Sequence, residues 1–210
     1  MTTEAQKFHD ALERLAENFV EKEANYGPAW RVMRLPSLID LLFVKAYRAK
    51  HLLTEAKEQK VNEPLRETFL DIASYTAITY IQASLPPWHF EALLGQPKSY
   101  FADLLTVLDA AKKLYEAKNA DYGSIWIVLP LPTLADFILA RTMRLKSSYS
   151  SDQALDLLIL SLLTHLKIQI STTLSNSPYT QIRTKTPLRA FDPTLWYHNT
   201  SPPSTPSQIA

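Results

Sequence analysis

The sequence contains one segment twice, and this duplication restricts the possible folds more than any other feature. Residues 22–50, KEANYGPAWRVMRLPSLIDLLFVKAYRAK, align without a gap with residues 118–146, KNADYGSIWIVLPLPTLADFILARTMRLK, at an offset of 96. Chance does not place glycine and tryptophan, both rare in this chain, at the same spacing twice, so the chain must fold as two related units. The identical positions, numbered in the first segment, are Lys22, Ala24, Tyr26, Gly27, Trp30, Val32, Leu35, Pro36, Leu38, Asp40, Arg48 and Lys50.

The hydrophobic pattern of each copy predicts three helices. Apolar residues recur with a period near 3.6, and the whole chain has three glycines, which disfavours a fold rich in tight hairpins. We expect helices over residues 4–24, 36–54 and 64–84 in the first copy, and over 99–120, 132–147 and 151–173 in the second. The first helix of each copy carries an apolar stripe, formed by Phe8, Leu12, Leu15 and Phe19, and by Leu104, Leu108, Ala111 and Tyr115.

These elements predict an all-α fold in which two tandem three-helix repeats pack as a pseudo-symmetric bundle. The expected divisions are a first repeat at 1–96, a second and degenerate repeat at 97–174, and a tail at 175–210. The tail is rich in Pro, Ser and Thr, a composition typical of irregular segments. Residues 88–94 are expected to form a short connecting helix.

Composition excludes several classes of function. The chain has no cysteine, which rules out disulfides and thiolate metal sites, and its net charge of +1 gives no strong signal for nucleic-acid binding. It lacks a signal-peptide pattern and any apolar run near the roughly 20 residues that span a bilayer, so we expect a cytoplasmic protein without membrane association. The glycines are too few and too far apart for a Walker or Rossmann phosphate loop.

Basic residues interrupt the apolar second helix of each copy. Lys45 and Arg48 stand three residues apart, and Arg141 and Arg144 repeat them in the second copy. The surrounding sequence is apolar on every side, so the pair is expected to be at least half-buried. A buried cation requires an anion nearby. That anion is either a structural carboxylate or a bound phosphate.

The third helix of each copy supplies acidic residues. Glu67 and Asp71 lie four residues apart on one helix face, and Asp152 and Asp156 match them in the second copy. One interpretation is an internal salt-bridge network that fixes how the helices pack. The other is a carboxylate cluster that holds Mg²⁺ while the basic residues receive phosphates. The sequence leaves both open.

Other repeated residues also allow two interpretations. Asp40 fits a capping box with Ser37, but it could instead contribute to a metal site. Trp30 either anchors the core or faces a nucleotide base. Tyr26 either packs or donates a hydrogen bond to a substrate, and Lys22 lies near a helix C-terminus, where a cation is favourable without any further role.

The repeated pattern resembles a known family. The strings K-x-x-[ND]-Y-G-x-x-W, L-P-[ST]-L-x-D and [KR]-x-x-R, present in both copies, are similar to the nucleotide modification associated domain family. That family is related to the MazG-like all-α nucleotide pyrophosphohydrolases. The resemblance covers roughly residues 5–173. It implies a helical bundle that cleaves a (deoxy)nucleoside triphosphate to a monophosphate and pyrophosphate with Mg²⁺ as cofactor.

The resemblance also implies roles for individual residues. The metal set would be Glu67, Asp71 and Asp40, and the substrate-binding set would be Lys22, Tyr26, Trp30, Arg34, Lys45 and Arg48. Glu67 and Asp71 follow an ExxxD spacing where the MazG-like proteins have ExxD, and no EExxE string occurs. Glu17 and Glu21 would have to replace that string, but they lie on the helix face opposite the apolar stripe. No catalytic residue is assigned.

The alternative hypothesis is a non-catalytic helical module that binds a nucleotide or a protein. Its basis is the missing EExxE string and the loss of polar residues in the second copy, where Ile127 replaces Arg31 and Pro130 replaces Arg34. We therefore expect the first copy to be the working half. The chain is expected to be a monomer with an internal pseudo-dimer, or a homodimer.

Overall fold

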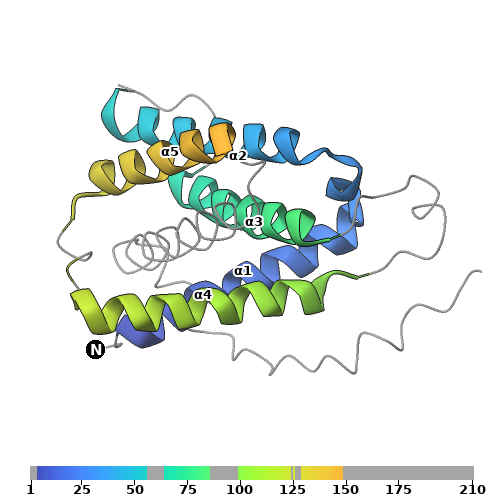
Figure 1. Cartoon of the computed structure of the whole chain (residues 1–210), viewed down its shortest axis with the longest axis horizontal. Coiled ribbons are helices and arrows are strands. Elements are labelled where there is room, and N and C mark those ends of the chain that lie inside the picture. The colour runs from blue at the N-terminus through green and yellow to red at the C-terminus, as the bar shows by residue number, and fades with distance from the viewer. Residues whose placement is uncertain (1–3, 56–63, 86–98, 124, 126–128, 149–210) are drawn as a thin grey trace, which may run out of the picture. The chain divides into compact units, whose positions relative to one another are not determined.

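A computed structural model describes residues 4–55, 64–85, 99–123, 125 and 129–148. Every regular element in these ranges is a helix, which confirms the all-α fold class (Figure 1). The helices are α1 (Glu4–Tyr26), the short 3₁₀ helix η1 (Ala29–Val32), α2 (Leu35–Thr54), α3 (Leu65–Ser84), α4 (Phe101–Tyr122) and α5 (Leu131–Ser148).

The helices begin and end close to where the sequence predicts. Helices α1 and α4 each end before a glycine, and Gly27 and Gly123 both have a φ of 59°. Only glycine adopts this region without strain, and each glycine amide donates to the carbonyl four residues earlier, to Glu23 at 2.8 Å and to Asn119 at 2.9 Å. The repeated glycine is therefore a repeated helix stop.

The predicted capping box at the start of α2 is wrong. The residue at the N-cap is Arg34, whose side chain makes no capping hydrogen bond, and Ser37 lies inside the helix. Pro36 occupies the first turn, where its fixed φ favours the helix and its missing N–H costs no hydrogen bond. Proline, rather than a Ser–Asp box, marks the beginning of α2.

The pattern of burial repeats with the sequence. Every buried position of α1 has a buried counterpart in α4 at the offset of 96, and the same holds for α2 and α5. These positions include the predicted apolar stripes, which are thereby confirmed. The matched pairs are Phe8/Leu104, Ala11/Val107, Leu12/Leu108, Leu15/Ala111 and Phe19/Tyr115, and Leu38/Leu134, Ile39/Ala135, Leu42/Ile138, Ala46/Thr142 and Ala49/Leu145.

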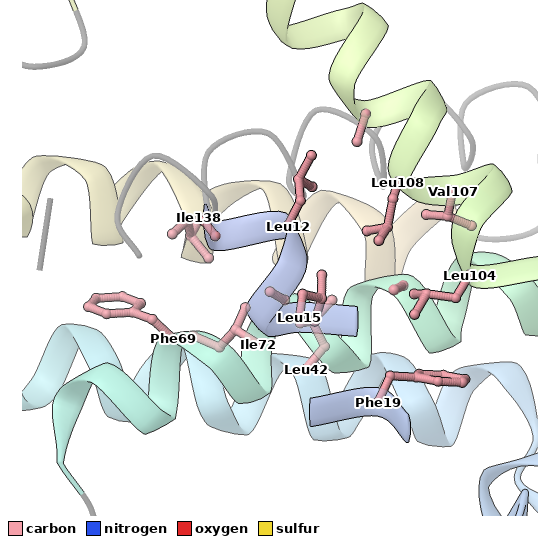
Figure 2. Close-up of a cluster of buried hydrophobic side chains, with 14 of the residues drawn as sticks. Leu12, Leu15, Phe19, Leu42, Phe69, Ile72, Leu104, Val107, Leu108 and Ile138 are labelled. Carbon is pink, nitrogen blue, oxygen red and sulfur yellow. The ribbon is translucent and has the colours of Figure 1, made fainter. Parts of the chain in front are cut away.

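Side chains from both copies share one core. Leu15 of α1, Leu42 of α2 and Ile72 of α3 belong to the same cluster as Leu104 of α4 and Ile138 of α5 (Figure 2). All five are at most 1% exposed. Burial of each such side chain contributes about 1.5–3 kcal/mol, so this cluster is the main source of stability in the described helices.

Helices α1 and α4 run antiparallel. The ring of Phe8, early in α1, stacks on Tyr115, late in α4, at 3.8 Å between centroids. At the other end, Glu23 of α1 accepts hydrogen bonds from the Tyr100 amide and the Ser99 hydroxyl, both at 2.8 Å. Glu23 thereby places a negative charge at the N-terminus of α4, where the helix dipole favours it.

Two reciprocal ion pairs join α2 to α5. Asp40 accepts from Lys146 at 2.5 Å, and Asp136 accepts from Lys50 at 3.0 Å. Asp136 is the counterpart of Asp40, and Lys146 is the counterpart of Lys50, so each copy offers the same two residues to the other. Such reciprocity defines a pseudo-twofold axis, with α2 and α5 antiparallel across it.

Several predictions fall outside the described residues. These are the third helix of the second copy with Asp152 and Asp156, the connecting helix at 88–94, Trp126, and the tail at 175–210. The arrangement as two complete three-helix repeats therefore stays a prediction. Among the described residues, none of the helices combines the length and apolar character needed to cross a bilayer.

The reciprocal ion pairs predict the outcome of a charge exchange. Asp40→Lys places two cations together and should destabilise the protein by about 1 kcal/mol, the upper range for exposed pairs. Adding Lys146→Asp restores an opposite-charge pair and should recover most of the loss. Urea unfolding of the two single variants and the double variant measures this coupling. Additive losses in the double variant would show that the two residues do not interact.

Candidate functional site

Asp71 is the centre of the best-defined polar cluster in the described helices. It lies on α3 and accepts hydrogen bonds from two lysines, from Lys22 of α1 at 2.6 Å and from Lys45 of α2 at 2.7 Å. Each lysine contacts a different carboxylate oxygen. One acidic side chain therefore connects three helices that lie far apart in sequence.

The charges of the two lysines keep Asp71 ionised. Burial alone would raise the pKa of this carboxyl, because its side chain is only 22% exposed. The hydrogen bonds and positive charges of Lys22 and Lys45 act in the opposite direction and outweigh burial, so the pKa of Asp71 lies below its ordinary value. At neutral pH the carboxylate is a fixed negative charge between two cations.

A third basic residue belongs to the neighbouring turn. Arg48, one turn after Lys45 on α2, donates a hydrogen bond to the hydroxyl of Thr68 on α3. Thr68 is fully buried and stands one turn before Asp71. We call Asp71, Lys22, Lys45, Arg48 and Thr68 the Asp71 cluster. On the α1 side, Asn18 donates to the Ser74 hydroxyl at 2.8 Å and continues the contact between α1 and α3.

The turn after α1 is fixed by a buried arginine. Arg31 is 5% exposed and donates to Gln82 of α3 at 2.5 Å. Its guanidinium also lies 5.6 Å from the Trp30 ring and 5.5 Å from the Tyr100 ring. Trp30 and Tyr100 meet edge to face at 5.0 Å. Trp30 is half-buried in these contacts, which fits the interpretation as a packing anchor.

Tyr26 and Arg34 occupy a different environment. Tyr26 is 75% exposed, and its counterpart Tyr122 is 70% exposed. Arg34 is also exposed. Tyr26 stands four residues after Lys22, on the same side of α1 one turn further along. Tyr26 is therefore accessible near the Asp71 cluster. Packing within the described residues does not explain why both copies have a tyrosine at this position.

The carboxylates predicted to hold Mg²⁺ do not come together in this structure. Asp71 is engaged by two lysines, Asp40 pairs with Lys146 of α5, and Glu67 is exposed on α3. Within the described ranges, no group of three or more acidic or histidine side chains is arranged to hold a metal ion. Glu17 and Glu21 are exposed, as their place opposite the apolar stripe predicts. These residues do not fit a three-carboxylate Mg²⁺ site.

Residues 22–83 match the family model described as Nucleotide modification associated domain 1. The matched range begins at Lys22 and ends near the last turn of α3, so it contains the whole Asp71 cluster together with Tyr26 and Trp30. The Nucleotide modification associated domain 1 match thus falls on the first copy, around the residues that the geometry brings together. No curated protein and no solved structure matches the chain.

Sequence reasoning found part of this site and missed part of it. An internal salt-bridge network was one of the two interpretations of the basic pair and the acids, and the structure shows such a contact between Lys45 and Asp71. The ion pair of Lys22 with Asp71 was missed, because Lys22 was interpreted as a helix-end cation or a substrate-binding residue. The part of Thr68 was missed because hydroxyls carry little signal. A signal existed for Arg31: the apolar Ile127 at the equivalent position indicates a buried environment.

Asp71→Asn tests the electrostatic role of the cluster. The substitution keeps the shape but removes the charge that two half-buried lysines share, so it should destabilise the protein by about 2 kcal/mol at pH 7. The folded pKa of Asp71 is lowered, so its contribution is complete above the unfolded-state pKa and disappears as the pH falls through the folded pKa. The difference between the proteins should therefore vanish in strong acid.

Urea unfolding of both proteins across acidic pH measures this effect. The matched control is Asp109→Asn, which removes an exposed carboxylate paired with Lys113 at 2.7 Å on α4. That control should leave stability nearly unchanged. Equal stability of Asp71→Asn and the unmodified protein at pH 7 would contradict the assigned role.

Proposed function

We propose that the protein is a helical nucleotide-binding module whose Asp71 cluster receives the phosphate groups. The observation that carries this proposal is the gathering of Lys22 and Lys45 from two helices on a single carboxylate. Arg48 binds Thr68, one turn before that carboxylate on α3. An ammonium group has three donors, and Asp71 accepts one hydrogen bond from each lysine. Asp71 thus holds both ammonium groups at one place.

The partial burial of these cations favours phosphate binding. The side chain of Lys45 is 25% exposed and that of Lys22 is 42% exposed, so both remain accessible while lying partly out of water. Charge interactions with a ligand are stronger in such a setting than in bulk solvent. Asp71 acts as a positioning residue, because it holds both ammonium groups at one place without contacting the ligand.

Tyr26 supplies the natural contact for a nucleotide base. It is exposed, it follows Lys22 by one turn of α1, and its ring offers a flat apolar face for stacking. The description of the matching family, which refers to nucleotide modification, supports a nucleotide rather than a free inorganic phosphate as the ligand. Trp30 has a supporting part in this proposal, because it packs with Arg31 and Tyr100.

Mg²⁺-dependent hydrolysis of a (deoxy)nucleoside triphosphate is the second candidate. It is favoured by Glu67 and Asp71, which stand one turn apart on α3 within the range of the family match. This activity, like the relationship to MazG-like enzymes, remains a proposal. In the described structure a metal ion would have to compete with Lys22 and Lys45 for Asp71, which is why binding is the better-supported function.

Replacing Lys45 tests the binding proposal. Lys45→Met keeps a long side chain but removes the charge, so affinity for a non-hydrolysable deoxynucleoside triphosphate should fall by about tenfold or more. Isothermal titration calorimetry measures the change. Lys113→Met is the matched control, because Lys113 is an exposed lysine with an acidic partner on α4. Equal weakening by both substitutions would show that the effect comes from the overall charge of the protein, and it would refute the proposed site.

A pyrophosphate-release assay with Mg²⁺ and a panel of nucleoside triphosphates separates the two candidates. The binding module predicts affinity without turnover. Turnover that Glu67→Gln and Asp71→Asn each abolish, with the fold intact by circular dichroism, would instead establish the hydrolase. Turnover that survives both substitutions would place the chemistry at other residues.

A further inference from the structure

The ligand-contacting residues of the proposed site recur in the second copy. Lys22, Tyr26, Lys45 and Arg48 correspond at the offset of 96 to Lys118, Tyr122, Arg141 and Arg144. Each basic position keeps its charge, although the neighbouring polar positions Arg31 and Arg34 have become Ile127 and Pro130. Loss of nearby polar groups without loss of these cations indicates that the cations have a use in the second copy as well.

The structure places these residues on equivalent elements. Helix α4 ends at Tyr122 as α1 ends at Tyr26, and a glycine with the same φ of 59° follows each. Helices α2 and α5 begin at equivalent residues, Leu35 and Leu131, and bury the same positions. Lys118 and Arg141 are half-buried, as are Lys22 and Lys45. The exposed tyrosine is also retained, at 75% in the first copy and 70% in the second.

The reciprocal ion pairs relate the two sets by the pseudo-twofold axis. They fix α2 against α5 so that Asp40 and Lys50 face Lys146 and Asp136. Lys45 lies midway between Asp40 and Lys50 along α2, and Arg141 lies midway between Asp136 and Lys146 along α5. The two central cations therefore lie at the same level of the antiparallel helix pair. Each occupies the same position within its own copy.

The chemistry of the second set suits a phosphate-bearing ligand. Burial lowers the pKa of Arg141, and the positive charge of Arg144, one turn away, lowers it further. Arginine offers several N–H donors in a planar fork that matches phosphate oxygens, so replacement of Lys45 by Arg141 preserves this capacity.

We infer that the second copy contains a second phosphate-binding site, formed by Lys118, Tyr122, Arg141 and Arg144, and that it takes the same class of phosphate-bearing nucleotide as the first. This inference rests on the proposed function of the Asp71 cluster. It makes the second copy a binding half in its own right, where the sequence led us to expect only the first copy to be the working half. The full chain accordingly binds two equivalents of ligand.

Calorimetric titration of the full chain with a non-hydrolysable deoxynucleoside triphosphate measures the number of sites. The informative variants form two matched pairs, Lys22→Gln with Lys118→Gln, and Lys45→Met with Arg141→Met. Lys22 and Lys118 lie near helix ends and are only half-buried, so the first pair keeps the test valid if the second pair disturbs folding. Circular dichroism and thermal unfolding check that each variant is folded.

The unmodified chain should bind two equivalents, and each variant should weaken one of them by about tenfold or more. One equivalent that Lys22→Gln weakens and Lys118→Gln leaves unchanged would overturn the second site while the proposed function stands. One equivalent weakened by both variants would show a single site shared by the copies and would also overturn it. Absence of binding by the unmodified chain would refute the proposed function and this inference together.

Discussion

The ion pairs of Asp71 hold together the three helices that carry the proposed phosphate-binding residues. A carboxylate on α3 holds Lys22 of α1 at 2.6 Å and Lys45 of α2 at 2.7 Å, so three helices meet at one charge. Apolar burial supplies most of the stability, but it does not determine where cations gather. Because an ionised carboxylate that is 22% exposed needs partners, the two lysines are drawn to one place, and the proposed phosphate site follows from that constraint.

The internal duplication gives the second copy the same pattern of buried and charged positions as the first. Equivalent positions are buried in α1 and α4 and in α2 and α5, and the reciprocal pairs Asp40–Lys146 and Lys50–Asp136 set the two copies against each other. These exposed pairs contribute little energy, but they oppose alternative registers of α2 against α5. A single hydrophobic core then includes residues of both copies (Figure 2). In the described helices, residues of both copies thus contribute to the same core.

Much of the fold could be predicted from the sequence, because periodicity and repetition are local signals. The helix stops at Gly27 and Gly123 and the apolar stripe through Phe8 and Phe19 were all readable. The site was harder to predict from the sequence, since charge partners depend on packing between distant helices. Asp40 fitted a capping box by spacing, yet α2 begins earlier and Asp40 pairs with Lys146. The resemblance implied the metal set, but the sequence does not reveal that lysines from α1 and α2 reach Asp71.

The proposed binding of nucleotide phosphates by the Asp71 cluster is tested most directly by a crystal structure of the full chain with a non-hydrolysable deoxynucleoside triphosphate. We expect phosphate oxygens within hydrogen-bond distance of the Lys22 or Lys45 ammonium group, with Asp71 still bound to both lysines. Phosphates bound away from these residues, or a metal ion on Asp71 with the lysines displaced, would contradict it.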